Sequence, residues 1–328
     1  MTSPNHITVD APARLHMGFM DLNGSLGRRF GSLGLALEEI GVRLRAEKAD
    51  NVRCEGEQSA RAENYLRLLQ QQIQLPGGAH INIERAIPEH AGLGSGTQLA
   101  IAVGMAATQL YGLDFSPRQI ALMLDRGNRS GIGVGAFEQG GFLVDGGRGS
   151  ADTLPPLISR LHFPSHWRVL LVMHHDVQGL HGAQEKNAFR DLPIFPEDKA
   201  AHLTRLVVMN ALPALAEARA QEFGAAINEL QNTVGDYFAP AQGGRYTSPL
   251  VTQILHWLER EGVAGIGQSS WGPTGFAIVE SENQAQILLA GLRKNWQHEQ
   301  LEFKICSARN RGGEVKTVSN IVAFKSAS

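Results

Sequence analysis

The sequence is poor in cysteine and nearly without net charge, and each shortage excludes a class of protein. Its 328 residues include only two cysteines, Cys54 and Cys306, too few for a disulfide framework and in keeping with a reducing cytoplasm. No cysteine pair or cysteine–histidine cluster has the spacing of a zinc site. The 30 basic and 32 acidic side chains nearly cancel, so bulk charge gives no support for a nucleic-acid partner.

Long apolar runs are also missing. The first ten residues are polar and lack the apolar core of a signal peptide. The longest apolar stretches, such as residues 99–107, are too short to span a bilayer. We therefore expect a soluble, cytoplasmic protein that does not act at a membrane.

Glycine, in contrast, is abundant. The chain has 37 glycines, about 11% of its residues, whereas average usage is roughly 7%. Such a surplus suggests backbone with positive φ, or backbone pressed against a ligand.

Strand and helix patterns alternate in both halves of the chain, which predicts an α+β or α/β protein. Strands are expected at residues 7–9, 15–20, 33–37, 42–46, 79–86, 137–144, 169–173, 275–280 and 301–306. Helices are expected at residues 61–74, 98–111, from Ser116-Pro117 onward, and at 199–220, 222–234, 249–261 and 283–295. A proline-rich stretch at residues 155–164 suggests two domains, 1–165 and 166–328.

The sharpest local feature is a glycine-rich turn between a predicted strand and a long apolar helix. Its residues are Gly92, Leu93, Gly94, Ser95, Gly96 and Thr97. Backbone N–H groups of such a turn, together with the positive end of the helix dipole, suit a phosphate or pyrophosphate. The alternative is a tight turn in which Ser95 or Thr97 caps the helix. The spacing matches neither the P-loop nor the Rossmann pattern.

Three segments resemble motifs of the GHMP kinase superfamily. Residues 88–97 resemble its phosphate-binding motif, residues 11–18 its first motif, and residues 265–275 its third, glycine-rich motif. The resemblance implies a ribosomal-protein-S5-like N-terminal domain followed by a ferredoxin-like C-terminal domain.

One position departs from the kinase pattern. Many of these kinases carry a catalytic aspartate in a Ser-Gly-x-Asp segment, and the matching stretch here is Ser130-Gly131-Ile132-Gly133. Glycine cannot accept a proton, so phosphoryl transfer by that route lacks its base. The second serine of the usual Gly-Leu-Gly-Ser-Ser run is also replaced, by Gly96. The pattern therefore indicates a kinase scaffold without kinase chemistry.

The whole chain most resembles one non-kinase branch, the β-ribofuranosylaminobenzene 5′-phosphate synthase family. The matching blocks are residues 14–24, 28–35, 92–97, 129–137, 140–142 and 268–274, and residues 179–189 match more loosely. The resemblance implies that 4-aminobenzoate and 5-phosphoribosyl-1-pyrophosphate combine and release carbon dioxide and pyrophosphate, a pentosyl transfer in tetrahydromethanopterin biosynthesis. Magnesium is expected to enter with the pyrophosphate, no metal ligand is assigned, and a homodimer is a possible assembly.

This chemistry suggests roles for individual residues. Asp21 is the candidate carboxylate that stabilises a cationic sugar, with Arg28 beside it as a second catalytic residue; the alternative is that Asp21 caps the Asn23-Gly24 turn. Arg14 and Arg129 are candidates for phosphate binding, because a guanidinium binds phosphate bidentately. The candidates for substrate binding are Arg29, Gln268, Ser269, Ser270 and Trp271. Trp271 or Phe30 is expected to line a flat slot for the aromatic ring, unless both are core residues.

Two other functions compete with this interpretation. An ATP-dependent small-molecule kinase is favoured by the glycine-rich turn and opposed by Gly133. A binding module without catalysis would keep the pocket and show ligand-induced stabilisation without product.

Overall fold

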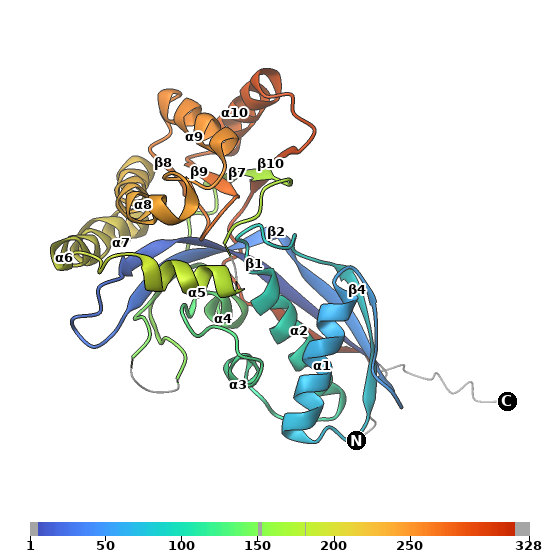
Figure 1. Ribbon diagram of the computed structural model, residues 1–328. Helices are drawn as coiled ribbons and strands as arrows, with labels where there is room; N and C mark the ends of the chain where they lie inside the picture. The colour runs from blue at the N-terminus through green and yellow to red at the C-terminus, as the bar shows by residue number, and fades with distance from the viewer. Residues whose placement is uncertain (1–5, 150–152, 181, 319–328) are drawn as a thin grey trace.

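The computed structural model describes residues 6–149, 153–180 and 182–318, which form two sheets surrounded by helices (Figure 1). The first sheet has the strand order β11-β1-β2-β4-β3, with β5 paired to β2 and β6 paired to β5. Its strands are β1 (His6–Asp21), β2 (Phe30–Ala49), β3 (Arg53–Gly56), β4 (Gly78–Arg85), β5 (Phe142–Asp145), β6 (Leu157–Leu161) and β11 (Glu314–Val318). The second sheet has the order β10-β7-β9-β8, formed by β7 (Arg168–His174), β8 (Gly265–Gln268), β9 (Gly275–Val279) and β10 (Leu301–Cys306).

The first two strands are longer than the sequence predicts. Each was expected as two short strands, and each is one continuous strand, β1 and β2, paired antiparallel along their length. Pro12 lies inside β1 rather than in a turn, and the pairing register shifts between Pro12 and Ala13. A proline has no N–H for the ladder and is tolerated in a strand at such a bulge. The predicted break between the strands at residues 7–9 and 15–20 was therefore wrong.

Helices cover both sheets and enclose their cores. The helices are α1 (Ser59–Ile73), α2 (Ser95–Leu110), α3 (Pro117–Met123), α4 (Ile132–Glu138), α5 (Gly182–Asp191), α6 (Glu197–Leu206), the π-helix η1 (Val207–Ala211), α7 (Leu212–Ala216), α8 (Ala220–Gln242), α9 (Pro249–Arg260) and α10 (Glu282–Asn295). Helices α1 and α2 lie against the first sheet (Figure 1). In β7, Leu170 and Val172 pack in the core with α9 and α10, whereas Val169 and Leu171 face the larger core shared with α8. This alternation is the period of two expected of a buried strand.

Two predicted elements differ from the structure for local reasons. A strand was predicted at residues 137–144, but residues 137 and 138 belong to helix α4 and the strand begins only at Phe142. Gly133 and Gly135 are buried in α4, and their missing side chains let it pack closely against Thr97 and Leu157. The expected helix at 199–220 is divided into α6, η1 and α7.

The helix predicted to start at Ser116 is confirmed. The Ser116 hydroxyl accepts from the N–H of Gln119, and the Gln119 side chain accepts from the Ser116 N–H, which completes a capping box.

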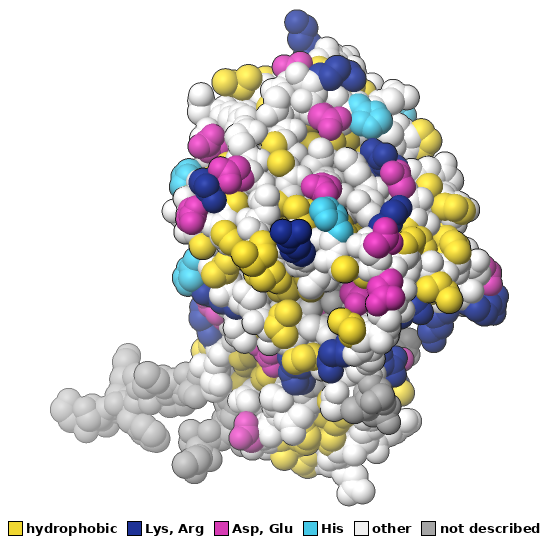
Figure 2. Space-filling model, turned by 90° about the vertical axis from the view of Figure 1, so that its left-hand side faces the viewer, with side chains coloured by type: hydrophobic (Ala, Val, Ile, Leu, Met, Phe, Trp, Pro, Cys, Tyr) yellow, Lys and Arg dark blue, Asp and Glu magenta, His cyan; other side chains and the backbone are white. Residues whose placement is uncertain are grey.

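The change from one sheet to the other falls between β6 and β7, near the predicted boundary at residue 165. However, β11 returns to pair with β1, so the end of the chain joins the first sheet. The face that carries α6, α7 and α8 mixes hydrophobic and charged side chains (Figure 2), and Ile194, Val208 and Met209 are exposed. Among the described residues, no helix combines the length and apolar character needed to cross a bilayer. The homodimer stays a prediction.

Candidate functional site

The glycine-rich turn leads directly into the first turn of α2. Gly92 and Gly94 have positive φ angles of 77° and 81°, which non-glycine residues rarely adopt. Gly94 is the N-cap residue and offers no side-chain cap, so the alternative in which Ser95 or Thr97 caps the helix was wrong. The first turn also contains no acidic residue. The backbone N–H groups at the start of α2 are thus available to an anion.

Arg14 and Ser269 hold this turn in place. Nη1 of Arg14 donates to the Gly92 carbonyl at 2.7 Å, and Oγ of Ser269 donates to the same oxygen at 2.8 Å. A Cβ atom at Gly94 would lie 2.9 Å from Cγ of Arg14, so glycine is required for the arginine to pack there. Burial lowers the pKa of Arg14 to about 10, while the charge of Glu185 acts in the opposite direction. The first and third motifs therefore meet at the phosphate turn.

Arg129 and Trp271 converge on Glu185 of α5. Nη1 of Arg129 forms an ion pair with Glu185, and Nε1 of Trp271 donates to the same carboxylate at 2.9 Å. Sequence reasoning did not select Glu185 as a site residue. The looser family match over residues 179–189 was the only signal, because α5 reaches the site through the tertiary fold alone.

Aromatic rings form a continuous cluster beside this ion pair. The Trp271 ring lies 4.3 Å from Phe238 and 5.4 Å from Phe189, and Phe189 lies 5.4 Å from Phe30 (centroid distances). Trp271 is buried, whereas Phe30 and Phe189 are half-buried. Cationic groups lie over the two half-buried rings, with Arg129 5.6 Å from Phe189 and Arg29 5.4 Å from Phe30. The cluster therefore combines apolar rings with cationic groups at its half-buried side.

Asp21, Arg28 and Arg29 lie together at the other end of β1. Oδ1 of Asp21 accepts from the N–H groups of Asn23 and Gly24 at 2.8 and 2.9 Å, so the turn-capping alternative is confirmed. Asp21 lies seven positions along β1 from Arg14, a path of roughly 23 Å at the usual rise. The structure therefore does not bring Asp21 next to the glycine-rich turn, and its catalytic role stays a prediction.

The two arginines of this group bind backbone carbonyls. The guanidinium of Arg28 is exposed and donates to the carbonyls of Gly146 and Gly147, both at 2.7 Å. Nε of Arg29 donates to the Leu22 carbonyl at 2.8 Å. Both arginines thus shape the loops around the end of β1, and their roles toward substrate also stay predictions.

Gln268 and Ser270 connect the third motif to β1 and α8. Oε1 of Gln268 accepts from the N–H of Thr247 at 2.7 Å, and the N–H of Ser270 donates to the His16 carbonyl at 3.2 Å. A cavity of about 20 Å³, roughly the size of one water, lies between them and α8. His16 lines it, is 2% exposed and has an unpartnered Nε2. Burial and then the charge of Arg14 lower the pKa of His16 well below its usual value, so the ring is neutral.

The position of the missing kinase acid faces the phosphate turn. A Cβ atom at Gly133 would lie 3.0 Å from Cγ2 of Thr97, and Nε2 of Gln98 donates to the Gly133 carbonyl at 2.6 Å. Nearby, the buried carboxylate of Asp145 accepts from Ser130, from the N–H of Gly131 and from Ser32. Asp145 is fully engaged with these donors, so it anchors the loop before α4 and does not replace the missing base.

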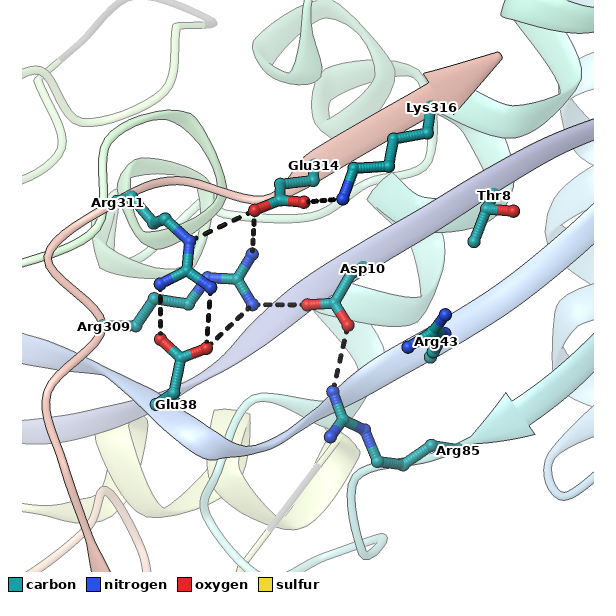
Figure 3. A pocket seen from close by; sticks show the side chains of 9 residues that line it. All are labelled: Thr8, Asp10, Glu38, Arg43, Arg85, Arg309, Arg311, Glu314 and Lys316. Atoms are coloured by element: carbon teal, nitrogen blue, oxygen red, sulfur yellow. Dashed lines mark hydrogen bonds and ion pairs between the residues drawn. The ribbon is translucent and has the colours of Figure 1, made fainter. Parts of the chain in front are cut away.

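A second, larger cavity of about 290 Å³ lies on β1, β2 and β11 (Figure 3). It is lined by Thr8, Asp10, Glu38, Arg43, Arg85, Arg309, Arg311, Glu314 and Lys316. Its acids and bases form ion pairs with one another, including Asp10 with Arg85 and Arg309. This network ties β11 to the sheet, and the lining has more cationic than acidic side chains.

Comparisons with known proteins identify the family of the chain. The family description "GHMP kinases N terminal domain" matches residues 60–141, and "GHMP kinases C terminal" matches residues 211–298. A β-ribofuranosylphenol 5′-phosphate synthase from Archaeoglobus fulgidus is 35% identical over 324 residues, covering 94% of this chain and 99% of the relative. The chain belongs to the β-ribofuranosylphenol 5′-phosphate synthase family. A synthase of the same name from Methanocaldococcus jannaschii is 32% identical over 84% of this chain and 92% of its own length.

Solved structures support the fold of this family member. Homoserine kinase from Cytophaga hutchinsonii superposes with a TM-score of 0.65 at 17% identity, covering 96% of this chain and 99% of that one. Mevalonate diphosphate decarboxylase from Staphylococcus aureus gives 0.66 at 14% identity, covering 95% and 98%. The GHMP-kinase-like α+β fold is therefore confirmed.

Proposed function

We propose that the protein is a pentosyltransferase that joins an aromatic acid to 5-phosphoribosyl-1-pyrophosphate and releases carbon dioxide and pyrophosphate. Membership in the synthase family carries this proposal, supported by the glycine-rich turn and by Gly133 in place of an acid. The homologous synthases are enzymes, and their names describe a ribofuranosylphenol 5′-phosphate product. The pathway, tetrahydromethanopterin biosynthesis, and the cytoplasmic location belong to the same proposal.

The proposed step balances without a redox cofactor. The bond between C1 of the ribose and the pyrophosphate oxygen breaks, and pyrophosphate leaves with the electron pair. The ring carbon that bears the carboxylate bonds to C1, and the carbon–carboxylate bond then breaks to release carbon dioxide. Its electron pair restores the aromatic ring. The protein has to bind the anionic leaving group and hold the ring against C1.

The residues divide this work between them. The N–H groups of the turn, held by Arg14 and Ser269, face an anion at the start of α2. Arg129 adds a cation beside the aromatic cluster, where the half-buried Phe30 and Phe189 offer apolar surface to the ring and Trp271 packs behind them as a core residue. Arg129 pairs with Glu185. A phosphate that binds Arg129 would therefore replace the carboxylate of Glu185 as the partner of this guanidinium.

The acceptor is expected to carry an amine or a hydroxyl on carbon 4. The sequence resemblance implies 4-aminobenzoate, whereas the names of the homologous synthases describe a phenol. Both groups donate electrons into the ring and support attack from the carboxylate-bearing carbon. We propose 4-aminobenzoate and keep 4-hydroxybenzoate as the substrate to compare.

Magnesium is proposed only as an ion that the pyrophosphate brings with it. Within residues 6–149, 153–180 and 182–318 there is no group of three or more His, Cys, Asp or Glu side chains that could hold a metal. We propose that oxygens of the substrate and water molecules bind this ion.

A mass-spectrometric product assay tests the proposal. Purified protein is incubated with magnesium, the phosphoribosyl donor and either 4-aminobenzoate or 4-hydroxybenzoate, and the coupled ribosyl product and pyrophosphate are measured. We expect product with at least one acid; no product with either would refute the synthase function. Formation of ADP from ATP and an added alcohol would instead support the kinase.

The same assay with Asp21→Asn tests the proposed carboxylate. Asparagine keeps an oxygen that accepts from Asn23 and Gly24, so the turn is retained while the charge is lost. A rate loss of about 100-fold or more is expected if the charge stabilises the cationic sugar. Parental activity of the variant would remove Asp21 from the mechanism. The distance of Asp21 from the glycine-rich turn would then be the reason that its charge does not matter.

A further inference from the structure

Arg61 of α1 points its guanidinium at the first turn of α2. A Cβ atom at Gly96 would lie 2.3 Å from Nη2 of Arg61, so the arginine occupies the space that any other residue at this position would fill. Nε of Arg61 donates to the Tyr65 hydroxyl at 3.1 Å, and Nη1 donates to Glu89 at 2.9 Å. Nη2 has no hydrogen bond to the described part of the chain. The glycine that departs from the kinase pattern is thus the residue that admits Arg61.

A second arginine lies over the same tyrosine ring. Cζ of Arg126 is 5.3 Å from the centroid of Tyr65, and Cζ of Arg61 is 6.0 Å from it. Nε of Arg126 is buried without a hydrogen-bond partner, and no carboxylate among the described residues forms an ion pair with this side chain. Two guanidinium groups therefore lie against the ring of Tyr65, and the exposed Glu89 pairs with Arg61.

Of the two arginines, Arg61 pairs with Glu89, and Arg126 has no such partner among the described residues, so one positive charge beside Tyr65 is not compensated by an ion pair. The N-terminal end of α2 is already positive, and Arg61 adds a cation there although cations are favoured at the opposite end of a helix. The first turn of α2 supplies no acid to compensate. Gly96 and Thr97 are both partly exposed, so a ligand can reach their N–H groups. A phosphoryl group bound between α2 and Arg61 would pair with each of these donors.

We propose that Arg61 and Arg126 form a second phosphoryl-binding subsite beside the glycine-rich turn, opened by Gly96. This inference rests on the proposed function, because the phosphoribosyl donor carries two separate phosphate-bearing ends. One end is the pyrophosphate and the other is the 5-phosphate. The subsite binds one of these two phosphate groups, and the glycine-rich turn with Arg14 binds the other. A site for a single polyphosphate chain would not need two separate phosphate-binding positions.

Binding measurements with two probes test the subsite. Calorimetry with magnesium is performed separately with inorganic pyrophosphate and with ribose 5-phosphate, without aromatic acid. We expect Arg61→Ala and Arg126→Ala each to weaken one of the two probes about tenfold or more, because each removes a charge-assisted hydrogen bond. Loss of pyrophosphate binding assigns the leaving group to the subsite, and loss of ribose 5-phosphate binding assigns the sugar phosphate. The matched control is Arg67→Ala, since Arg67 is exposed on the same helix and pairs with Glu63.

Gly96→Ala separates binding from stability. Alanine favours a helix more than glycine does, so the variant is expected to melt no lower than the parent protein. Its methyl group nevertheless displaces Nη2 of Arg61, so the same probe binds about tenfold more weakly. In the Arg61→Ala background, Gly96→Ala is expected to cost nothing more.

Two results would overturn the subsite. One is parental binding of both probes by Arg61→Ala and Arg126→Ala. The other is full additivity of Gly96→Ala with Arg61→Ala, which would mean that the glycine acts without the arginine. These outcomes differ from failure of the proposed function. If the parent protein forms product but Arg61→Ala and Arg126→Ala bind both probes normally, the subsite alone is refuted. If these variants bind a probe more weakly but the parent protein forms no product, the synthase function alone is refuted.

Discussion

A substitution at Gly133 tests whether Thr97 restricts this position to glycine. Gly133 is buried in α4, and a Cβ atom there would lie 3.0 Å from Cγ2 and 3.4 Å from Cβ of Thr97. Such overpacking typically costs about 1–3 kcal/mol. Alanine gains about 1 kcal/mol over glycine in helix propensity. Gly133→Ala is therefore expected to lower the free energy of unfolding by about 1 kcal/mol.

The double variant with Thr97→Ser isolates the contact. Serine lacks Cγ2, so the added methyl group no longer meets a neighbour at 3.0 Å. In the Thr97→Ser background, Gly133→Ala should instead stabilise the protein by about 1 kcal/mol, which is its helix propensity alone. Urea unfolding at fixed pH measures all four proteins of the cycle. Equal effects of Gly133→Ala in both backgrounds would show that Thr97 does not restrict this position.

Gly133→Asp extends the test to chemistry. The aspartate side chain would have to displace Thr97, so its carboxylate would not be positioned to accept a proton from a substrate hydroxyl. Misplacement of a catalytic group by 1 Å can cost about 100-fold in rate. We expect no ADP formation from ATP with added alcohols, in the variant as in the parent. ADP formation above the parental level would show that this one residue separates the synthase from a kinase.

Two further predictions concern buried groups. Asp145 accepts hydrogen bonds from Ser32, Ser130 and Gly131, and Asp145→Asn leaves only one acceptor oxygen for these donors. We therefore expect the free energy of unfolding, measured in urea, to fall by about 2–4 kcal/mol. The exposed control Asp114→Asn should change it by less than about 0.5 kcal/mol. A loss no larger than the control's would contradict the network. His16 has a pKa below its unfolded value, so the unfolded chain binds the extra proton and stability falls as pH drops below about 6.5, by up to about 1.4 kcal/mol per pH unit. Unfolding at pH 5, 6 and 7 should show a shallower pH dependence in His16→Asn, and identical slopes would mean that His16 titrates normally.

Local patterns predicted several elements well because their causes are local. The capping box at Ser116 and the apolar run that becomes α2 depend on neighbours within a few residues. The extent of β1 was not predictable in this way, because the pairing with β2 carries the strand past Pro12. Helix α4 was not predicted either, because glycines such as Gly133 and Gly135 disfavour a helix locally, whereas in the structure they allow close packing against α2 and β6.

The sequence by itself determined the family, the phosphate turn and the absence of the kinase acid, because each depends on residue types at fixed short spacings. Only the tertiary structure decided which of the candidate residues meet. It joined Arg129 and Trp271 through Glu185, left Asp21 at the far end of β1, and paired Gly96 with Arg61. These relations connect residues that are dozens of positions apart, and their distances follow from strand pairing and helix packing rather than from any local pattern.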